Sequence, residues 1–524
     1  MGIPSYYKKL QHSIPGLLQG YSQSVTWLFM DFNCLIYYCI PHVEIFMTCK
    51  EYKASSLVDA TDIYEDALIQ LVILHLTDVV REIGGPHNNV FIAIDGVVPM
   101  AKMRQQRLRR FKSVWEKEYK KENTRWDTNA ITPGTVFMQK LSHALQMVCD
   151  RYKWTLSSEM VPGEGEHKIQ AELRTGKYKG EDIVIYGMDA DLIVLSLLSQ
   201  TLYDLGNVWT CREVAHSAPV VIPVESSAIP INHRGPIFEW LSIHLLKQWL
   251  LEQLHQTDPS FILTYCFAMS VLGNDFLPSS LGLKMHDGGH DELIKQLTIL
   301  VTPLIDGAYQ ILYENLFELF RLLSQFEPHR IATYIKGKQR MANHCSEKGL
   351  GENNWPLAHI EEGLIGPMWS TNYWKQMDAS VEDACQEYLT GIRWIWAYYT
   401  GKPVCFNWFY PYSLPPLWLN LGQMGLTLYQ TGQDNRGNYS SLQSELPIKM
   451  RAQEIQPVEQ LCLVLPLSSW SLIPACPQKK FPMLAPQFFP SSFTFESVGN
   501  RMFWQCHPCI PTPTPLELKA VLSS

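Results

Sequence analysis

Three apolar segments of strand length each end at an acidic residue, and this recurrence restricts the possible folds more than any other feature of the chain. They are VTWLFMDFN at 25–33, NVFIAIDG at 89–96 and the start of EDIVIYGMDADLIVLSLL at 181–198, where an apolar helix follows directly. Residues 60–84 repeat apolar positions at helical spacing. Strands that alternate with helices predict an α/β fold, with a mainly parallel, twisted sheet flanked by helices.

Four acidic residues stand at the carboxyl ends of these predicted strands: Asp31, Asp95, Asp189 and Asp191. In open parallel sheets, ligands bind in the crevice outside the carboxyl ends of the strands. We therefore expect these four side chains to converge at one edge of the sheet.

Three further acids occupy places where the backbone can bend or break. The segment VPGEGEHKI sets Glu164 and Glu166 between glycines, which let the chain bend so that both carboxylates approach one ligand. The apolar stretch at 261–278 is interpreted as a buried helix that breaks at Gly273, and Asp275 follows just beyond. Taken one at a time, each acid is also explained as a helix cap or a solvated loop residue.

Seven carboxylates in one place repel one another unless cations neutralise them. Hard oxygen ligands select Mg²⁺ or Mn²⁺. Two such ions about 3.5–4 Å apart can activate water and stabilise the leaving oxygen in phosphodiester cleavage. The sequence therefore predicts a catalytic site for two Mg²⁺ or Mn²⁺ ions, with the ligands Asp31, Asp95, Glu164, Glu166, Asp189, Asp191 and Asp275.

A basic helix is predicted directly after the second strand. Its sequence, AKMRQQRLRRFKSVWEKEYKK at 101–121, contains nine Lys or Arg residues. Lys102, Gln106, Arg109 and Arg110 fall on one helix face, which can hold a phosphate group. The alternative is a helix whose charges are simply solvated.

Length, charge and cysteine content limit the class of protein. The 524 residues suffice for a large core and more than one lobe, and the net charge of −8 leaves room only for a local phosphate-binding patch. The N-terminus lacks the apolar segment of a secretory signal, and the longest nearly uncharged stretch, 261–273, is too short to span a bilayer. The scattered cysteines, with Cys506 and Cys509 as the single CxxC pair, are expected to be reduced structural thiols of an intracellular protein, with the cytoplasm favoured over the nucleus.

These motifs together resemble the catalytic core of the Xrn family of 5′→3′ exoribonucleases. The matching stretches run in family order from residue 1 to about 511: MGIPSYYKKL, MDFNCLIYYC, IAIDGVVPMAKMRQQRLRRF, ITPGTVFM, VPGEGEHKI, YGMDADLIVL, LGNDFLP, EYLTGIRWIWAYYTG, WFYPY, PVEQLCLVLP and FWQCHPCIP. The resemblance implies a 5′-nuclease or PIN-like core, in a compact form without the long C-terminal modules of Xrn1-type members.

The resemblance and the residue pattern divide the chain into three parts. Residues 1–321 are expected to form the catalytic region, and 367–524 a second region that wraps it. The less regular stretch 322–366 is interpreted as a linker or insertion. The second region is rich in Trp, Tyr and Pro and contains a predicted helix at 381–400.

The resemblance implies a processive, divalent-metal-dependent exonuclease that degrades RNA with a 5′-monophosphate to mononucleotides. Its 5′-phosphate pocket would be Lys102, Gln106, Arg109 and Arg110, and Lys102 would also steady the transition-state phosphate. Capped and triphosphorylated ends would be too large, and residues 2–4 would line the RNA path. Single-stranded RNA is the expected partner, together with decapping or transcription-termination proteins, and neither a nucleotide cofactor nor a membrane is expected.

Some aromatic positions depart from the family pattern. Tyr37 stands where the family usually has a His that stacks with the first base, and tyrosine keeps a face for stacking. In CFNWFYPYSLPP, Trp408 is kept as a second stacking residue, whereas Phe406 replaces a Trp and Ser413 replaces a His. Without the resemblance, core packing explains these aromatic residues equally well.

Two rival functions fit parts of the sequence. A DNA nuclease of the 5′-nuclease class shares a similar acidic arrangement but lacks the second-half matches. An inactive Xrn-like scaffold would bind RNA without cleaving it, although all seven acids and four pocket residues are kept here. Comparing the degradation of 5′-phosphorylated RNA and DNA separates the DNA nuclease from the exoribonuclease. An RNA-decay function that survives Asp191→Ala would support the scaffold.

Overall fold

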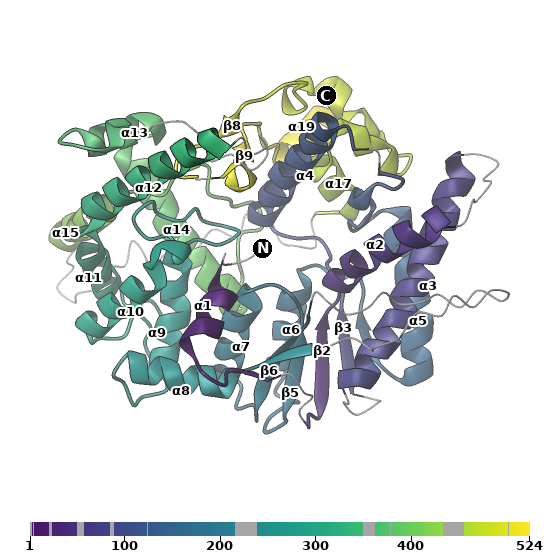
Figure 1. Ribbon diagram of the computed structural model, residues 1–524, viewed down its shortest axis with the longest axis horizontal. Helices are drawn as coiled ribbons and strands as arrows, with labels where there is room; N and C mark the ends of the chain where they lie inside the picture. The colour runs from purple at the N-terminus through teal and green to yellow at the C-terminus, as the bar shows by residue number, and fades with distance from the viewer. Residues whose placement is uncertain are drawn as a thin grey trace.

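The centre of the protein is a seven-stranded sheet in the order β1-β7-β6-β5-β2-β3-β4 (Figure 1). This computed structural model describes residues 3, 5–19, 24–49, 57–83, 89–122, 124–214, 238–348, 362–377, 379–432, 455–500 and 502–523. The neighbours β6, β5, β2, β3 and β4 run parallel, and β7 and β1 are antiparallel at one side. The strands are β1 (Leu18–Gln19), β2 (Trp27–Asp31), β3 (Val90–Ala93), β4 (Thr155–Ser157), β5 (Ile183–Tyr186), β6 (Val208–Glu213) and β7 (Phe238–Ser242). The predicted α/β fold with a mainly parallel sheet is confirmed.

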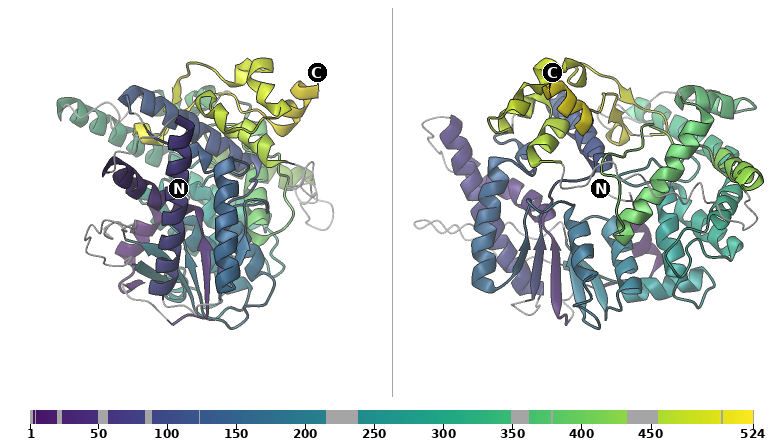
Figure 2. Two further views of the ribbon diagram at one scale, coloured as in Figure 1. Left: turned by 90° about the vertical axis from the view of Figure 1, so that its right-hand side faces the viewer. Right: turned by 180° about the vertical axis from the view of Figure 1, so that it is seen from behind.

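Apolar side chains on both faces explain why the central strands read as continuous apolar runs. In β2, Phe29 packs into one core, and Leu28 and Met30 pack into the other. One core lies between the sheet and α2, α3 and α5, and the other between the sheet and α6 to α9 (Figures 1 and 2). The helices of this part are α1 (Tyr6–Ser13), α2 (Asn33–Cys49), α3 (Leu57–Ile83), α4 (Met100–Lys120), α5 (Val136–Tyr152), α6 (Gly165–Leu173), α7 (Asp191–Leu202), α8 (Ile243–Gln253), α9 (Phe261–Ala268) and α10 (Gly289–Leu300).

The second half of the chain packs against the first at the end of the sheet that carries the strand carboxyl ends. Its C-terminal elements, yellow in Figures 1 and 2, lie beside α4. The elements are α11 (Tyr313–Ser324), α12 (Glu327–Lys348), α13 (Trp369–Met377), α14 (Val381–Thr400), α15 (Trp418–Gly432), α17 (Pro457–Val464), α18 (Phe481–Leu484), α19 (Pro515–Ser523) and the hairpin of β8 (Phe495–Glu496) and β9 (His507–Pro508). The helix predicted at 381–400 is found as α14. No helix in the described part of the chain is long and apolar enough to cross a membrane.

The stretch 322–366 is more regular than the sequence pattern indicates. Its first part completes α11 and forms most of the 22-residue helix α12, and residues 349–361 lie outside the described part of the chain. Helix α12 buries Ile331, Tyr334 and Ile335 on one side. Its remaining positions are largely polar, which explains why the apolar pattern of a helix is weak in this stretch. Residues 327–348 are thus helical, whereas the linker or insertion at 322–366 and the three-part division remain predictions.

Helix α4 is held in place by backbone carbonyls of the second half. Arg107 is fully buried and donates hydrogen bonds to the carbonyl oxygens of Leu463 (2.9 Å), Pro511 (3.1 Å) and Phe488. Lys112 donates to two carbonyls of the segment that leads into β9, and Arg104 donates to the carbonyls of residues 410 and 411. Part of the basic character of this helix thus serves the packing of the C-terminal region.

Candidate active site

A cavity of about 190 Å³ lies at the carboxyl edge of the parallel strands. Asp31 ends β2, Asp95 follows β3, and Asp189 follows β5. The predicted acids that line the cavity are Asp31, Asp95, Glu164, Glu166 and Asp189. The structure therefore brings five of the seven acids to the edge where parallel strands present ligand-binding groups. A larger cavity of about 540 Å³, beside α7 and α8, contains none of the predicted site residues.

The start of helix α6 places two glutamates in this cavity. Glu164 is the residue before the helix and Glu166 lies in its first turn. Between them, the backbone N–H of Gly165 donates a 2.7 Å hydrogen bond to Asp95 Oδ1. A Cβ atom at 165 would collide with Asp31 Oδ1 and come within 3.0 Å of a carbonyl oxygen of β3. A glycine is therefore required sterically, because the helix start touches the strand ends directly.

Lys102 connects the cavity to a sixth acid. Its Nζ lies 2.5 Å from Glu164 Oε2 and 2.7 Å from Asp275 Oδ2. Asp275 follows Gly273, whose φ of 88° ends the 3-10 helix η2 (Met269–Leu272) that continues α9. Burial alone would lower the pKa of Lys102, but the two carboxylates hold it well above its ordinary value. Lys102 is therefore a charged group that neutralises part of the acidic cluster.

The seventh acid, Asp191, is the first residue of α7 and is 4% exposed. Its Oδ1 is buried and has no hydrogen-bond partner. Burial and the charges of Asp275 and Asp189 raise the pKa of Asp191 to about 7. Burial and neighbouring acids also raise the pKa values of Glu166 and Asp31 well above their ordinary range. Without a bound cation, these carboxylates are too close together for all of them to ionise easily.

This donor set fits a divalent metal ion. The side chains offer hard carboxylate oxygens, which Mg²⁺ and Mn²⁺ prefer. The unpartnered Oδ1 of Asp191 and the raised pKa values indicate negative charge that Lys102 alone does not neutralise. Glu164, Glu166 and His167 have ligand atoms that all lie within 4.8 Å of one another. The site can therefore bind a cation that favours the ionised form of the acids.

Helix α4 supplies a basic part of the same cavity lining, formed by Lys102, Gln106, Arg109 and Arg110. Gln106 and Arg110 are buried, so the alternative of a fully solvated helix face does not hold for them. Arg110 Nη2 donates a 2.8 Å hydrogen bond to Thr132 Oγ1, while Arg110 Nη1 and Gln106 Oε1 are buried without a partner. Burial and the neighbouring Arg109 lower the pKa of Arg110 to about 10, which leaves it charged near neutral pH.

The two predicted stacking residues lie in different places. Tyr37, on α2, lines the cavity and is 45% exposed, so its ring has room for a base. Trp408 is half-buried and packs on Trp394, with ring centroids 5.4 Å apart. Its indole N–H donates to Glu387 Oε2 at 3.1 Å. Trp408 is therefore not brought to the cavity that holds Tyr37, and Phe406 is buried in the core.

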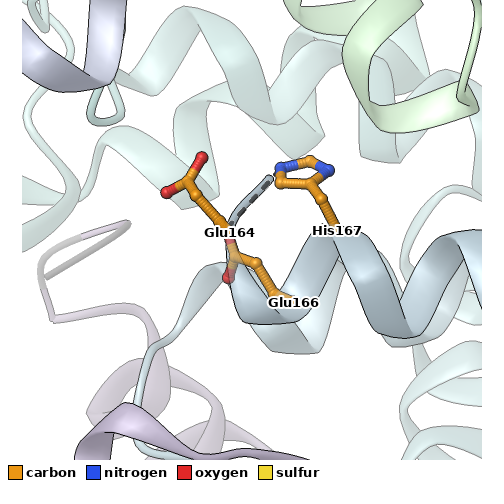
Figure 3. A group of neighbouring side chains, drawn as sticks. All are labelled: Glu164, Glu166 and His167. Carbon is orange, nitrogen blue, oxygen red and sulfur yellow. Dashed lines mark ion pairs between the residues drawn. The ribbon is translucent and has the colours of Figure 1, made fainter. Parts of the chain in front are cut away.

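Several residues that contact the acids were not predicted from the sequence. The Tyr398 hydroxyl of α14 donates to Glu164 Oε1 at 3.1 Å, and Asn33 Nδ2 donates to Asp95 Oδ2 at 3.0 Å. His167 lies beside Glu166 (Figure 3). All three belong to motifs that carry the family resemblance, AYYTG, MDFN and GEGEHK. The motifs therefore marked these residues, but the sequence alone could not show that they contact the acids.

Other predicted positions have no place in the cavity. Residues 2 and 4 of the expected RNA path lie outside the described part of the chain. Cys506 is buried and Cys509 is exposed, and neither belongs to the candidate metal-ligand group found among the described residues. Ser413 donates to Glu496 Oε2 at 3.2 Å near the β8–β9 hairpin.

The mainly parallel sheet, with carboxylates gathered at its carboxyl edge, defines the fold class of a PIN-like core. Residues 1–203 match the family described as XRN 5'-3' exonuclease N-terminus. This match, together with similarity to 5'-3' exoribonucleases over most of the chain, confirms the Xrn family resemblance.

Three relatives illustrate the extent of the similarity. The human 5'-3' exoribonuclease 1 is 25% identical over 98% of this chain and 33% of its own length. The 5'-3' exoribonuclease 2 of Schizosaccharomyces pombe is 29% identical over 54% of this chain and 35% of its own length. The 5'-3' exoribonuclease 2 of Candida albicans is 32% identical over 43% of this chain and 28% of its own length. The chain thus spans about a third of the length of the curated relatives it matches.

Proposed function

We propose that this protein is a divalent-metal-dependent 5′→3′ exoribonuclease that degrades 5′-monophosphorylated RNA processively to mononucleotides. The observation that carries the proposal is one cavity lined by five carboxylates and by the Lys102, Gln106, Arg109 and Arg110 face of α4. Its volume of about 190 Å³ is below the roughly 300–1,000 Å³ of typical small-molecule sites. Such a cavity suits the end of a chain better than a duplex.

Each group has a role in this proposal. Gln106, Arg109 and Arg110 bind the terminal phosphate, and Arg110 contributes a buried N–H that has no partner within the protein. Lys102, fixed between two carboxylates, steadies the charge that develops on the scissile phosphate. Tyr37 stacks with the first base. Mg²⁺ or Mn²⁺ ions held by the seven acids would supply an activated water and charge stabilisation.

The proposed pocket would also make the enzyme selective for the 5′ end of the RNA. The phosphate-binding residues and the acids line the same small cavity, so a bound terminal phosphate sets the distance to the next phosphodiester. A triphosphate or a cap is larger, and the proposal predicts that such ends are poor substrates. RNA is favoured over DNA because the relatives that match this chain are named exoribonucleases, one of them over 98% of the chain.

One 3′-labelled RNA with three different 5′ ends tests the proposal. The monophosphate, triphosphate and hydroxyl forms are incubated with the protein in Mg²⁺ and in EDTA, beside a 5′-phosphorylated DNA of the same sequence. We expect Mg²⁺-dependent loss of the monophosphate RNA, release of mononucleotides and few intermediates. The variant Asp191→Asn should abolish the reaction, whereas Lys120→Ala, at the exposed end of α4, should retain it.

Three outcomes would contradict the proposal. Preferred cleavage of DNA, or cuts inside the chain, would indicate a 5′-nuclease of the DNA-directed type. Equal degradation of all three RNA ends would remove the phosphate role from α4. Binding of RNA without degradation under any metal condition would indicate a scaffold.

A further inference from the structure

His167 is a nitrogen donor placed among the carboxylates of the site. Figure 3 shows its ring near Glu164 and Glu166, on the first turn of α6. One ligand atom from each of the three residues lies within 4.8 Å of the other two. The three therefore form a group of two oxygens and one nitrogen that can reach a common ion.

The imidazole nitrogen that faces this group has no partner within the protein. His167 is 7% exposed, and its Nε2 is buried without a hydrogen bond. The nearest acid atom, Glu166 Oε1, lies 3.7 Å away, which is too long for a hydrogen bond. A buried polar atom without a partner costs about 1–3 kcal/mol, and this one faces a group of carboxylates, so a bound ion there would satisfy it.

The packing of the ring fixes the direction of this nitrogen. The His167 ring lies against the Tyr398 ring, with centroids 3.7 Å apart and planes tilted by 35°. The Tyr398 hydroxyl in turn donates to Glu164 Oε1. The same tyrosine therefore positions both a carboxylate and the imidazole of the group.

Histidine binds metals through the lone pair of a ring nitrogen. The buried Nε2 of His167 belongs to the same group of ligand atoms as Glu164 and Glu166 and is placed to do so.

The spacing also suits a shared ion. With metal–ligand bonds of about 2.1 Å, two ligands at right angles are roughly 3.0 Å apart and opposed ligands roughly 4.2 Å apart. The 3.7 Å between His167 Nε2 and Glu166 Oε1 falls between these limits. We propose that His167 Nε2 is a direct ligand of the ion held by Glu164 and Glu166, and that this position consequently prefers Mn²⁺ to Mg²⁺.

The preference follows from ligand chemistry. Mg²⁺ and Mn²⁺ both favour oxygen ligands, but Mn²⁺ is a first-row transition-metal ion and accepts an imidazole nitrogen more readily than Mg²⁺, which retains its water. The inference rests on the proposed function in one respect, namely that the acids bind divalent cations. The inference adds a nitrogen ligand to the site. It also predicts that Mn²⁺ binds more tightly than Mg²⁺, which carboxylate ligands alone would not predict.

Pulsed electron paramagnetic resonance of the full chain with one and two equivalents of Mn²⁺, without RNA, tests this directly. A ligating imidazole gives a ¹⁴N modulation of the Mn²⁺ signal. We expect it in the unaltered protein and in the control His143→Gln, an exposed residue of α5. We expect its loss in His167→Phe, which keeps a ring against Tyr398, and in His167→Gln, which keeps a polar group.

Calorimetric titration gives the second readout. In the two His167 variants, Mn²⁺ affinity should fall by about tenfold or more, while Mg²⁺ affinity should change much less. Circular dichroism and melting curves verify that both variants fold.

Absence of ¹⁴N modulation in the unaltered protein at both metal ratios would overturn the inference, even if the RNA is degraded. Equal losses of Mn²⁺ and Mg²⁺ affinity would overturn the stated preference. Failure to bind Mn²⁺ at all would contradict the proposed function as well as the inference. Clear ¹⁴N modulation without RNA degradation would contradict the proposed function alone.

Discussion

The substitution Arg107→Met should detach the C-terminal region from helix α4. Methionine keeps much of the apolar stem but removes the guanidinium that donates to three carbonyl oxygens. Each charge-assisted hydrogen bond is worth about 1.5–3 kcal/mol, and the desolvation cost of the buried guanidinium offsets part of the sum. We expect the C-terminal region to lose about 3–5 kcal/mol of stability against local unfolding.

Native-state proteolysis followed by mass spectrometry measures this loss. When opening is fast relative to cleavage, the cleavage rate reports the population of the open form. A loss of 3–5 kcal/mol predicts at least about 100-fold faster cleavage within 455–523. The matched control is Lys120→Met on the same helix, because Lys120 is exposed and its 3.9 Å ion pair with Glu122 is weak.

A small increase in the cleavage rate would refute this reasoning. Acceleration of less than about fivefold, equivalent to roughly 1 kcal/mol, would mean that Arg107 does not hold the C-terminal region in place. Unchanged cleavage in the C-terminal region with faster cleavage in α4 itself would show that the helix, and not the wrapping segment, depends on the contact.

Three further predictions concern the site. Arg109→Ala should lower kcat/KM on 5′-monophosphate RNA by about 10–100-fold and leave Mn²⁺ affinity, measured by calorimetry, almost unchanged; parallel losses would contradict a phosphate role. Tyr37→Ala should shorten the runs between dissociation events in a trap experiment, because base stacking contributes about 1–3 kcal/mol; an unchanged product distribution would remove Tyr37 from this role. The metal-free protein should lose thermal stability as pH rises from about 4 to about 7 and then level off, because the folded-state pKa of Asp191 is raised to about 7 while in the unfolded chain it is about 4. Asp191→Asn should reduce that loss and the stabilisation by Mg²⁺, and a variant that melts like the unaltered protein at both pH 5 and pH 7 would refute the assignment.

The acids and the basic helix face were predictable because their signals are local. Apolar runs that end at Asp31 and Asp95 mark buried parallel strands, and strand direction alone brings their carboxyl ends together. The spacing of Lys102, Gln106 and Arg110 follows from helical geometry. These inferences needed only the period of a strand or a helix.

Other parts of the site depend on tertiary contacts that no local pattern encodes. Lys102 is an ion-pair partner of Asp275, 173 residues away, as well as part of the basic face. Spacing places Arg107 off the face that contains Arg110, but it cannot show that Arg107 binds carbonyl oxygens of the second half. Likewise, no local pattern shows that the Trp408 ring packs on Trp394 within the second half.

The close approach of α6 to the sheet limits which substitutions the site can accept during evolution. Because the hydrogen of Gly165 already fills the gap to Asp31, no side chain can enter there unless the Asp31 carboxylate or the helix start moves. Movement of the helix start would carry Glu164 and Glu166 together, since they flank the same residue. A substitution at residue 165 therefore disturbs the positions of Asp31, Glu164 and Glu166 together. Substitutions at exposed residues that line the cavity, such as Tyr37, are tolerated far more readily.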